Sequence, residues 1–246
     1  MRREAQNILL LLVGGALLKI TLNGTYLRYV KPTVKPWVIT AGVVMVALAV
    51  IAIVADIRAA RPGIVQTDPA HDAHGHSHAA RSPWLLILPV LAIFLIAPPA
   101  LGADSVLRSD GRSAVTAPVV QQGASAFPPL PKTAVVPLEL SEFITRSVWD
   151  GTHSLTGRTV ALTGFIVQEN GSTYVARLVI TCCAADATPM KVKLAGGQAA
   201  ALSNDQWIVA DGILVPGSAT AANEYTPTLD VQAITQTTQP ADPYEY

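Results

Sequence analysis

The sequence predicts a membrane protein with a helical N-terminal half and a small all-β C-terminal domain. Half of its 246 residues are hydrophobic, and apolar stretches long enough to span a bilayer occur only before residue 102. After residue 132, short segments of alternating hydrophobicity are bounded by Gly, Pro and Asn, as in β-strands. We therefore expect transmembrane helices followed by a five-stranded, OB-like β-barrel with one short helix.

Three N-terminal segments have the length and hydrophobicity of transmembrane helices. They cover about residues 5–27, 37–57 and 84–101. Trp37 and Trp84 open the second and third, as expected for tryptophan at a membrane interface. In the first, Lys19 lies near one end if the span is 5–22, and near the middle if it is 8–27. The first alternative lets Lys19 reach the lipid headgroups, whereas the second would place a polar site within the bilayer.

The basic residues of the loops set the expected orientation. With the N-terminus in the cytoplasm, the inner side carries Arg2, Arg3, Arg58, Arg61 and Arg81. The outer side carries Arg28, Lys31 and Lys35, and also Lys19 if its side chain reaches the headgroups on that side. This excess on the inner side places the chain after Leu101 outside the cytoplasm. We expect a multi-pass protein of the cell membrane, in contact with the lipid bilayer, with an extracytoplasmic C-terminal domain.

The loop at 67–82, between the second and third predicted helices, is rich in histidine. Its candidate ligands are His71, His74, His76 and His78. Imidazole suits Zn, Ni, Cu and Co, and the intervening Gly75 and Ser77 leave the loop free to wrap around an ion. The loop is either a capture site for a transition metal or a solvated polar segment. In the expected orientation it is cytoplasmic.

The remainder of the chain is expected to form a linker and one soluble domain. Residues 102–132 are rich in Ser, Ala, Gly, Gln and Pro, which predicts a flexible tether. Residues 133–240 suit one small domain. The stretch 138–150 has apolar residues at the spacing of a helix with one buried face. Strands are expected at 159–167, 174–181, 190–194, 206–215 and 228–235.

The strand pattern favours a closed barrel of the OB type over an open β-sandwich. Gly164 lies inside the first expected strand and Asp211-Gly212 inside the fourth, at positions suited to bends. OB domains that bind nucleic acid carry basic and aromatic residues on one face. Aromatic residues make up 6% of this chain and its formal net charge is zero, so we expect no nucleic-acid partner.

Both cysteines of the chain, Cys182 and Cys183, are adjacent, and Asp186 follows three residues later. Adjacent residues of a regular strand point to opposite faces, so the two thiols can meet one ligand only where the strand breaks. Pro189 and the preceding Ala-Ala-Asp run predict such a turn. There, two thiolates and a carboxylate could bind zinc or copper, with a fourth ligand from His153 or from a partner.

Two other interpretations of this stretch remain open. In a redox site, one thiol of lowered pKa would react and its neighbour would resolve the product. In a structural role, one cysteine would be a small core residue and Asp186 would cap a turn. No Ser/His/Asp arrangement, phosphate-binding loop or pair of carboxylates in the sequence indicates a hydrolase. We therefore expect a protein that is not an enzyme.

The Thr-Cys-Cys-Ala-Ala-Asp-Ala-x-Pro motif at 181–189 resembles that of the YcgQ-like bacterial membrane proteins. The resemblance extends to four other features: the segments 164–167 and 207–212, Arg177 and the histidine loop. It covers most of the chain except the linker. No activity is established for this family, whose members are considered the accessory half of a two-component system with a multi-spanning permease. The resemblance implies a permease subunit with a solute- or metal-handling domain.

Three functions follow from these observations. The first is an integral membrane accessory subunit of a permease that handles a transition metal through Cys182, Cys183 and Asp186. The second is a membrane-tethered thiol oxidoreductase, and the third is a structural docking domain without a ligand.

Overall fold

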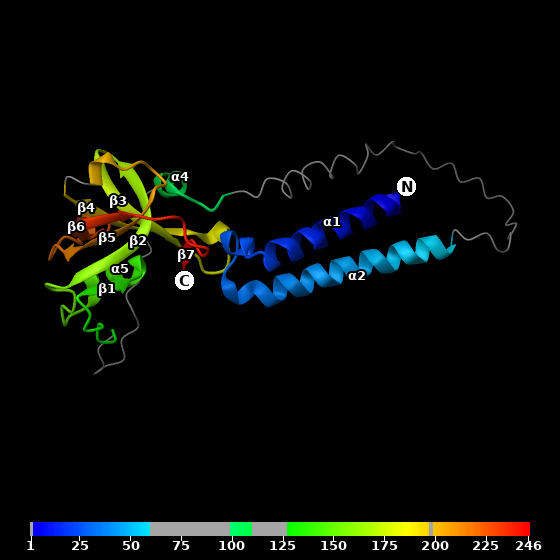
Figure 1. Cartoon of the computed structure of the whole chain (residues 1–246), viewed down its shortest axis with the longest axis horizontal. Coiled ribbons are helices and arrows are strands. Elements are labelled where there is room, and N and C mark those ends of the chain that lie inside the picture. The colour runs from blue at the N-terminus through cyan, green and yellow to red at the C-terminus, as the bar shows by residue number, and fades with distance from the viewer. Residues whose placement is uncertain (1, 60–98, 110–126, 197–198) are drawn as a thin grey trace, which may run out of the picture. The chain divides into compact units, whose positions relative to one another are not determined.

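The structure, a computed structural model, describes residues 2–59, 99–109, 127–196 and 199–246 (Figure 1). The chain divides into two compact units. The first comprises Met1–Tyr26 and Pro32–Pro99, and the second comprises Leu27–Lys31 and Ala100–Tyr246. The histidine loop and all of the third predicted transmembrane helix except its last three residues lie outside the described residues.

The first unit contains a pair of packed helices, α1 (Arg2–Leu22) and α2 (Lys35–Ala59). The helices come close at two glycines, because a Cβ atom at Gly14 would lie 3.0 Å from the carbonyl oxygen of Gly42. Farther along, Asn7 Nδ2 donates a hydrogen bond to Asp56 Oδ2 at 3.3 Å. The connection holds two short 3₁₀ turns, η1 (Thr25–Arg28) and η2 (Pro32–Val34).

The first helix is shorter than the predicted span of 5–27, because it ends at Leu22. Asn23 follows directly, and its side-chain oxygen accepts a hydrogen bond from Thr25 N at 3.0 Å, which turns the chain. Lys19 consequently lies in the last helical turn, where the helix dipole favours a positive charge. This end matches the shorter of the two predicted spans.

Among the described residues, one helix is long and apolar enough to cross a membrane. It runs from Pro32 to Arg58 with a mean hydropathy of 2.9 and is mostly uncovered by other parts of the protein. Large apolar side chains such as Leu48 and Ile51 are exposed along it, which suits contact with lipid. The helix α1 contributes a shorter apolar stretch, Gln6–Leu22.

The second unit is built on a mixed sheet of seven strands in the order β1-β2-β5-β6-β4-β3-β7. Its elements are α4 (Ala103–Leu107), β1 (Val135–Leu138), α5 (Leu140–Trp149), β2 (Thr159–Glu169), β3 (Ser172–Val179), η4 (Ala184–Asp186), β4 (Thr188–Ala195), η5 (Ala199–Ala201), β5 (Trp207–Leu214), η6 (Ala221–Asn223), β6 (Thr228–Gln236) and β7 (Tyr244–Glu245). The five predicted strands and the predicted helix are all present. The predicted strand number is wrong, since β1 and β7 extend the sheet.

The long strand β2 pairs with two neighbours. It is antiparallel to β5 along its first part and to β3 along its last part. Gly164 lies where this change occurs, and a Cβ atom there would be 2.5 Å from the carbonyl oxygen of Ala176. The position therefore requires glycine. The predicted β domain with one short helix after its first residues is confirmed in its strands and helix. The closure of the sheet into an OB-like barrel stays a prediction.

Two hydrophobic clusters stabilise the second unit. The first lies between the sheet and α5, whose Leu140, Phe143 and Ile144 are buried, as the helical spacing predicted. The second includes Ala103 and Val106 of α4. The compact unit is therefore wider than the expected domain of 133–240, because α4 comes from the stretch expected to be linker and β7 lies after residue 240.

The last residues of the chain hold several elements together. The strand β7 pairs in parallel with β3. Glu245 is 2% exposed, and its carboxylate accepts hydrogen bonds from Leu140 N at 2.8 Å and Ser141 N at 2.9 Å, at the N-terminus of α5. Arg177 of β3 faces the same carboxylate at 4.0 Å. One buried charge thus joins the tail, α5 and the strand that leads to the cysteines.

We predict that Glu245→Ala destabilises the protein by about 2–4 kcal/mol, because it removes a buried acceptor of two backbone N–H groups and leaves Arg177 without its carboxylate. The measurement is chemical unfolding of the full chain in detergent, followed by tryptophan fluorescence. Asp230→Ala, which removes an exposed carboxylate of β6, is the control. Equal unfolding midpoints for the two variants would contradict the role of Glu245.

Candidate metal centre

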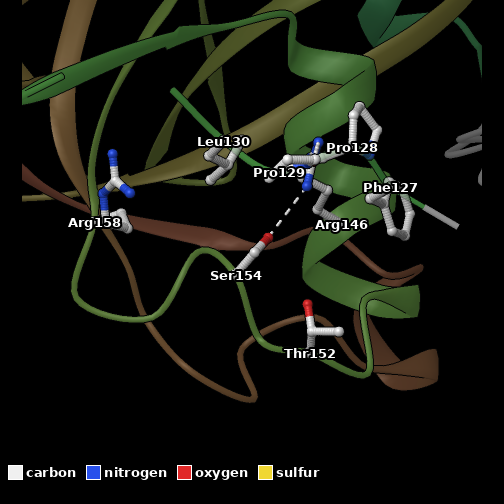
Figure 2. A pocket seen from close by; sticks show the side chains of 8 residues that line it. All are labelled: Phe127, Pro128, Pro129, Leu130, Arg146, Thr152, Ser154 and Arg158. Carbon is white, nitrogen blue, oxygen red and sulfur yellow. Dashed lines mark hydrogen bonds between the residues drawn. The ribbon is translucent and has the colours of Figure 1, made fainter. Parts of the chain in front are cut away.

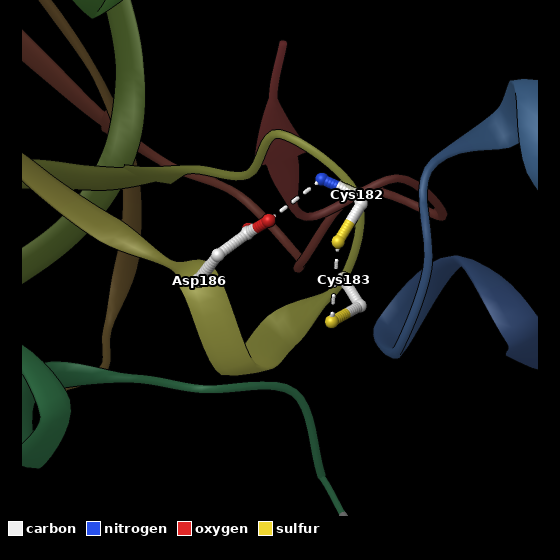
Figure 3. Close-up of side chains that lie close together, drawn as sticks. All are labelled: Cys182, Cys183 and Asp186. Atoms are coloured by element: carbon white, nitrogen blue, oxygen red, sulfur yellow. Dashed lines mark hydrogen bonds between the residues drawn. The ribbon is translucent and has the colours of Figure 1, made fainter.

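The chain turns back on itself directly after β3, at residues 180–187, as the sequence predicted. The carboxylate of Asp186 closes this turn (Figure 3). Its Oδ1 accepts a hydrogen bond from Thr181 N at 2.9 Å and its Oδ2 accepts one from Cys182 N at 2.8 Å. Asp186 N in turn donates to the carbonyl oxygen of Cys183 at 3.0 Å. The turn ends at β4, whose Pro189 is buried.

The turn brings the three predicted ligands together. The Sγ atoms of Cys182 and Cys183 lie 3.6 Å apart, and one ligand atom from each cysteine and from Asp186 lies within 4.8 Å of the others. In a tetrahedral zinc site, two thiolate sulfurs are about 3.8 Å apart and a sulfur and an oxygen about 3.6 Å apart. The thiols already have this spacing, and the carboxylate needs to move by about 1 Å at most.

The carboxylate of Asp186 keeps room for a metal ion while it closes the turn. A carboxylate offers about four lone-pair sites, and the two backbone N–H groups occupy one site on each oxygen. Because its hydrogen bonds come from the backbone of the turn itself, the oxygen atoms are held beside the thiols. The same residue can therefore shape the site and serve as a ligand.

Neither cysteine is a core residue. Cys182 is exposed and Cys183 is half-buried, and both are free thiols. The interpretation of one cysteine as a small core hydrophobe therefore does not fit the structure. The other part of the structural interpretation does fit, because Asp186 closes a turn.

The neighbours of Cys182 hold it in the thiol form. A hydrogen bond with the Asp186 carboxylate, and after it one with Cys183, raises the pKa of Cys182 to about 11. The interaction with the Cys182 thiol, followed by the Thr181 N–H, lowers the pKa of Asp186. A cysteine that reacts as a nucleophile at neutral pH requires a lowered pKa, and the raised pKa of Cys182 is the opposite of this requirement. A metal ion would instead take the place of the thiol proton.

A distant part of the chain contacts the cysteine turn. The segment Leu27–Lys31, between α1 and α2, lies in the same compact unit as the β domain. Val30 forms an antiparallel bridge with Cys183, Ala184 N donates to the carbonyl oxygen of Tyr29 at 2.8 Å, and Lys31 N donates to that of Cys182 at 3.2 Å. This pairing could not be predicted from the sequence, because backbone hydrogen bonds leave no pattern in the side chains.

The one described histidine, His153, is not part of this group. Among the described residues, the only group of metal-ligating side chains with this spacing is Cys182, Cys183 and Asp186. His153, proposed as a fourth ligand, lies in the turn after α5, where its backbone N–H donates to the carbonyl oxygen of Asp150 at 3.0 Å. The loop candidates His71, His74, His76 and His78 lie outside the described residues.

A cavity of about 310 Å³ beside α5 is a second place to consider (Figure 2). Two arginines, Arg146 and Arg158, line it. The Arg146 side chain is 1% exposed, and its guanidinium donates to Glu142 at 2.8 Å, to the carbonyl oxygen of Pro128 at 2.8 Å and to Ser154 at 3.2 Å. The charge of Arg146 is thus already balanced by a carboxylate, and its hydrogen bonds fasten the chain at Pro128 to α5.

Two family models match the chain. The DUF1980 N-terminal domain matches residues 6–110, and the DUF1980 C-terminal domain matches residues 143–246. The chain belongs to the DUF1980 family. This agrees with the resemblance to the YcgQ-like proteins. No curated protein and no solved structure matches the chain.

The two matched regions of this DUF1980 protein do not correspond to the two compact units. Leu27–Lys31 and α4 belong to the N-terminal match, yet both pack with the C-terminal match in the second unit. The N-terminal region therefore supplies part of the surroundings of the cysteine turn.

We predict that Cys182 is alkylated slowly despite its exposure. In Cys183→Ser, where Cys182 is the only thiol, the rate with iodoacetamide should rise by about tenfold per pH unit above pH 8, because only the thiolate reacts. Adding Asp186→Asn should speed the reaction at pH 8, since the group that raises the thiol pKa is removed. Rapid alkylation at pH 6 would contradict this and would favour the oxidoreductase.

Proposed function

We propose that the protein is an integral membrane accessory subunit of a permease and that the turn at Cys182, Cys183 and Asp186 handles a transition metal ion. The convergence of two thiols and a carboxylate, with the sulfur atoms 3.6 Å apart, carries this proposal. Membership of the DUF1980 family supports the accessory role, because the resemblance to YcgQ-like proteins implied a permease partner.

Zinc or copper fits the donor set best. Thiolates with one carboxylate oxygen suit Zn²⁺, and soft sulfur ligands also suit Cu(I). The described part of the chain offers three ligands at this turn, which leaves a fourth position for water or for a group on the partner. An open position suits capture and transfer of an ion, whereas a purely structural zinc site has four protein ligands.

The proposed arrangement in the membrane has three spanning helices and an extracytoplasmic β domain. Because Leu27–Lys31 is hydrogen-bonded to the cysteine turn, this loop and the β domain belong on the same side. If α2 spans the bilayer, residue 59 lies on the opposite side, and the chain has to cross once more before Ala100. This reasoning supports the third helix expected at 84–101, and the distribution of basic residues supports the orientation.

We predict that the β domain binds zinc through its two thiols. The full chain in detergent, with His71, His74, His76 and His78 changed to Ala so that the loop does not contribute, should retain about one zinc ion per chain after desalting. Adding Cys182→Ser and Cys183→Ser should abolish retention, Asp186→Asn should weaken it, and Asp230→Asn should leave it unchanged. Equal zinc content with and without the thiols would overturn the proposal.

The zinc affinity should also rise with pH. Zinc has to displace the thiol protons, and the pKa of Cys182 is raised to about 11, so the thiol is protonated throughout the range pH 6–8. The affinity should therefore increase by about tenfold per pH unit for each proton displaced, measured by competition with a chelator of known affinity. An affinity independent of pH in this range would contradict thiolate ligation.

We predict that the loop between α1 and α2 and the β domain are labelled from the same side of the membrane. In a Cys182→Ser/Cys183→Ser background, the exposed positions Thr33 and Ala221 are changed singly to cysteine. A membrane-impermeant maleimide should label both in intact cells and should not label Arg58→Cys, at the far end of α2. Labelling of Thr33→Cys without Ala221→Cys in intact cells would contradict the proposed topology.

A further inference from the structure

The backbone on both sides of the thiols is held by a segment that the ligand motif does not contain. Three consecutive residues of the turn, Cys182, Cys183 and Ala184, are paired with residues 29–31 through two backbone hydrogen bonds, which form the antiparallel bridge between Val30 and Cys183. Cys183 has the extended backbone of a strand, with φ −155° and ψ 168°. The bridge fixes the two sulfur-bearing residues from one side, and Asp186 fixes Cys182 from within the turn.

The docked segment is itself held by the C-terminal tail. The hydroxyl of Tyr244 donates a hydrogen bond to the carbonyl oxygen of Arg28 at 3.0 Å and accepts one from Leu101 N at 3.1 Å. Lys31 Nζ lies 5.5 Å from the ring centre of Tyr246. The segment Leu27–Lys31 therefore contacts both the cysteine turn and the C-terminal tail.

We propose that Leu27–Lys31 is a positioning element of the metal site: its pairing with residues 182–184 holds the two thiols at ligand spacing, and metal binding in turn stabilises the docked segment. This inference rests on the proposed metal-binding function. Coupling between two binding events is reciprocal. The free energy by which the docked segment strengthens metal binding therefore equals the free energy by which the metal strengthens docking of the segment. Because the segment is part of the loop that joins α1 to α2, metal binding at the site also stabilises the conformation of that loop.

Position 31 allows a test that spares the metal ligands. Lys31→Pro removes the N–H that donates to the Cys182 carbonyl, and it preserves an extended backbone, since Lys31 already precedes Pro32. Lys31→Gln is the matched control, because it keeps the N–H and removes the charge. In the full chain with the four loop histidines changed to Ala, Lys31→Pro should weaken zinc affinity by about 2- to 10-fold, the value of one hydrogen bond. Lys31→Gln should leave the affinity unchanged.

Hydrogen exchange provides a second measurement that requires no variant at position 31. In the chain with the four loop histidines changed to Ala, zinc should slow amide exchange at Lys31 and Ala184, and it should have no such effect when Cys182→Ser/Cys183→Ser is added. If this chain binds zinc through its thiols and neither the exchange of these amides nor the affinity of Lys31→Pro responds, the positioning role is refuted while the metal site stands. If this chain binds no zinc, the proposed function itself fails.

Discussion

The cysteine site depends on the two hydrogen bonds that the backbone N–H groups of Thr181 and Cys182 donate to the Asp186 carboxylate. In a continuing strand, the side chains of Cys182 and Cys183 would point to opposite faces and could not share an ion. By accepting two N–H groups, the carboxylate reverses the chain within a few residues and brings the sulfur atoms to 3.6 Å. The hydrogen bond with the same carboxylate, followed by the one with Cys183, raises the pKa of the Cys182 thiol, which favours protonation until a cation replaces the proton.

The turn is held in place by contacts from chain segments that are far apart in sequence. The carbonyl of Glu245 accepts a hydrogen bond from Ile180 N at 3.0 Å just before the turn, while the Glu245 carboxylate caps α5. On its other side the turn is paired with Leu27–Lys31. A single reversal that carries the ligands is thus fixed by the C-terminus and by the loop between two N-terminal helices. For this reason, the boundaries of the two DUF1980 matches differ from those of the two compact units: residues 27–31 of the N-terminal match belong to the unit that contains the C-terminal match.

Features with a local periodic signal could be predicted from the sequence. The period-two pattern identified β2 to β6, and the helical spacing of Leu140, Phe143 and Ile144 identified α5. Both could be predicted because an element with one buried face has apolar residues at regular intervals in the sequence. The break at Asp186 and Pro189 was also predictable from turn chemistry. The strand β7, with two residues, is too short to show any period, and it forms only because β3 offers an edge. The docking of residues 27–31 could not be predicted, because it depends on backbone N–H and C=O groups that are present in every sequence.

The central claim is that the thiols of Cys182 and Cys183 bind one ion. X-ray absorption at the zinc edge tests this most directly, on the zinc-loaded full chain with the four loop histidines changed to Ala. We predict two sulfur atoms at about 2.3 Å and oxygen at about 2.0–2.2 Å in the first coordination shell, with the sulfur signal lost in Cys182→Ser/Cys183→Ser. A zinc ion surrounded only by oxygen and nitrogen in the thiol-containing protein would contradict the account.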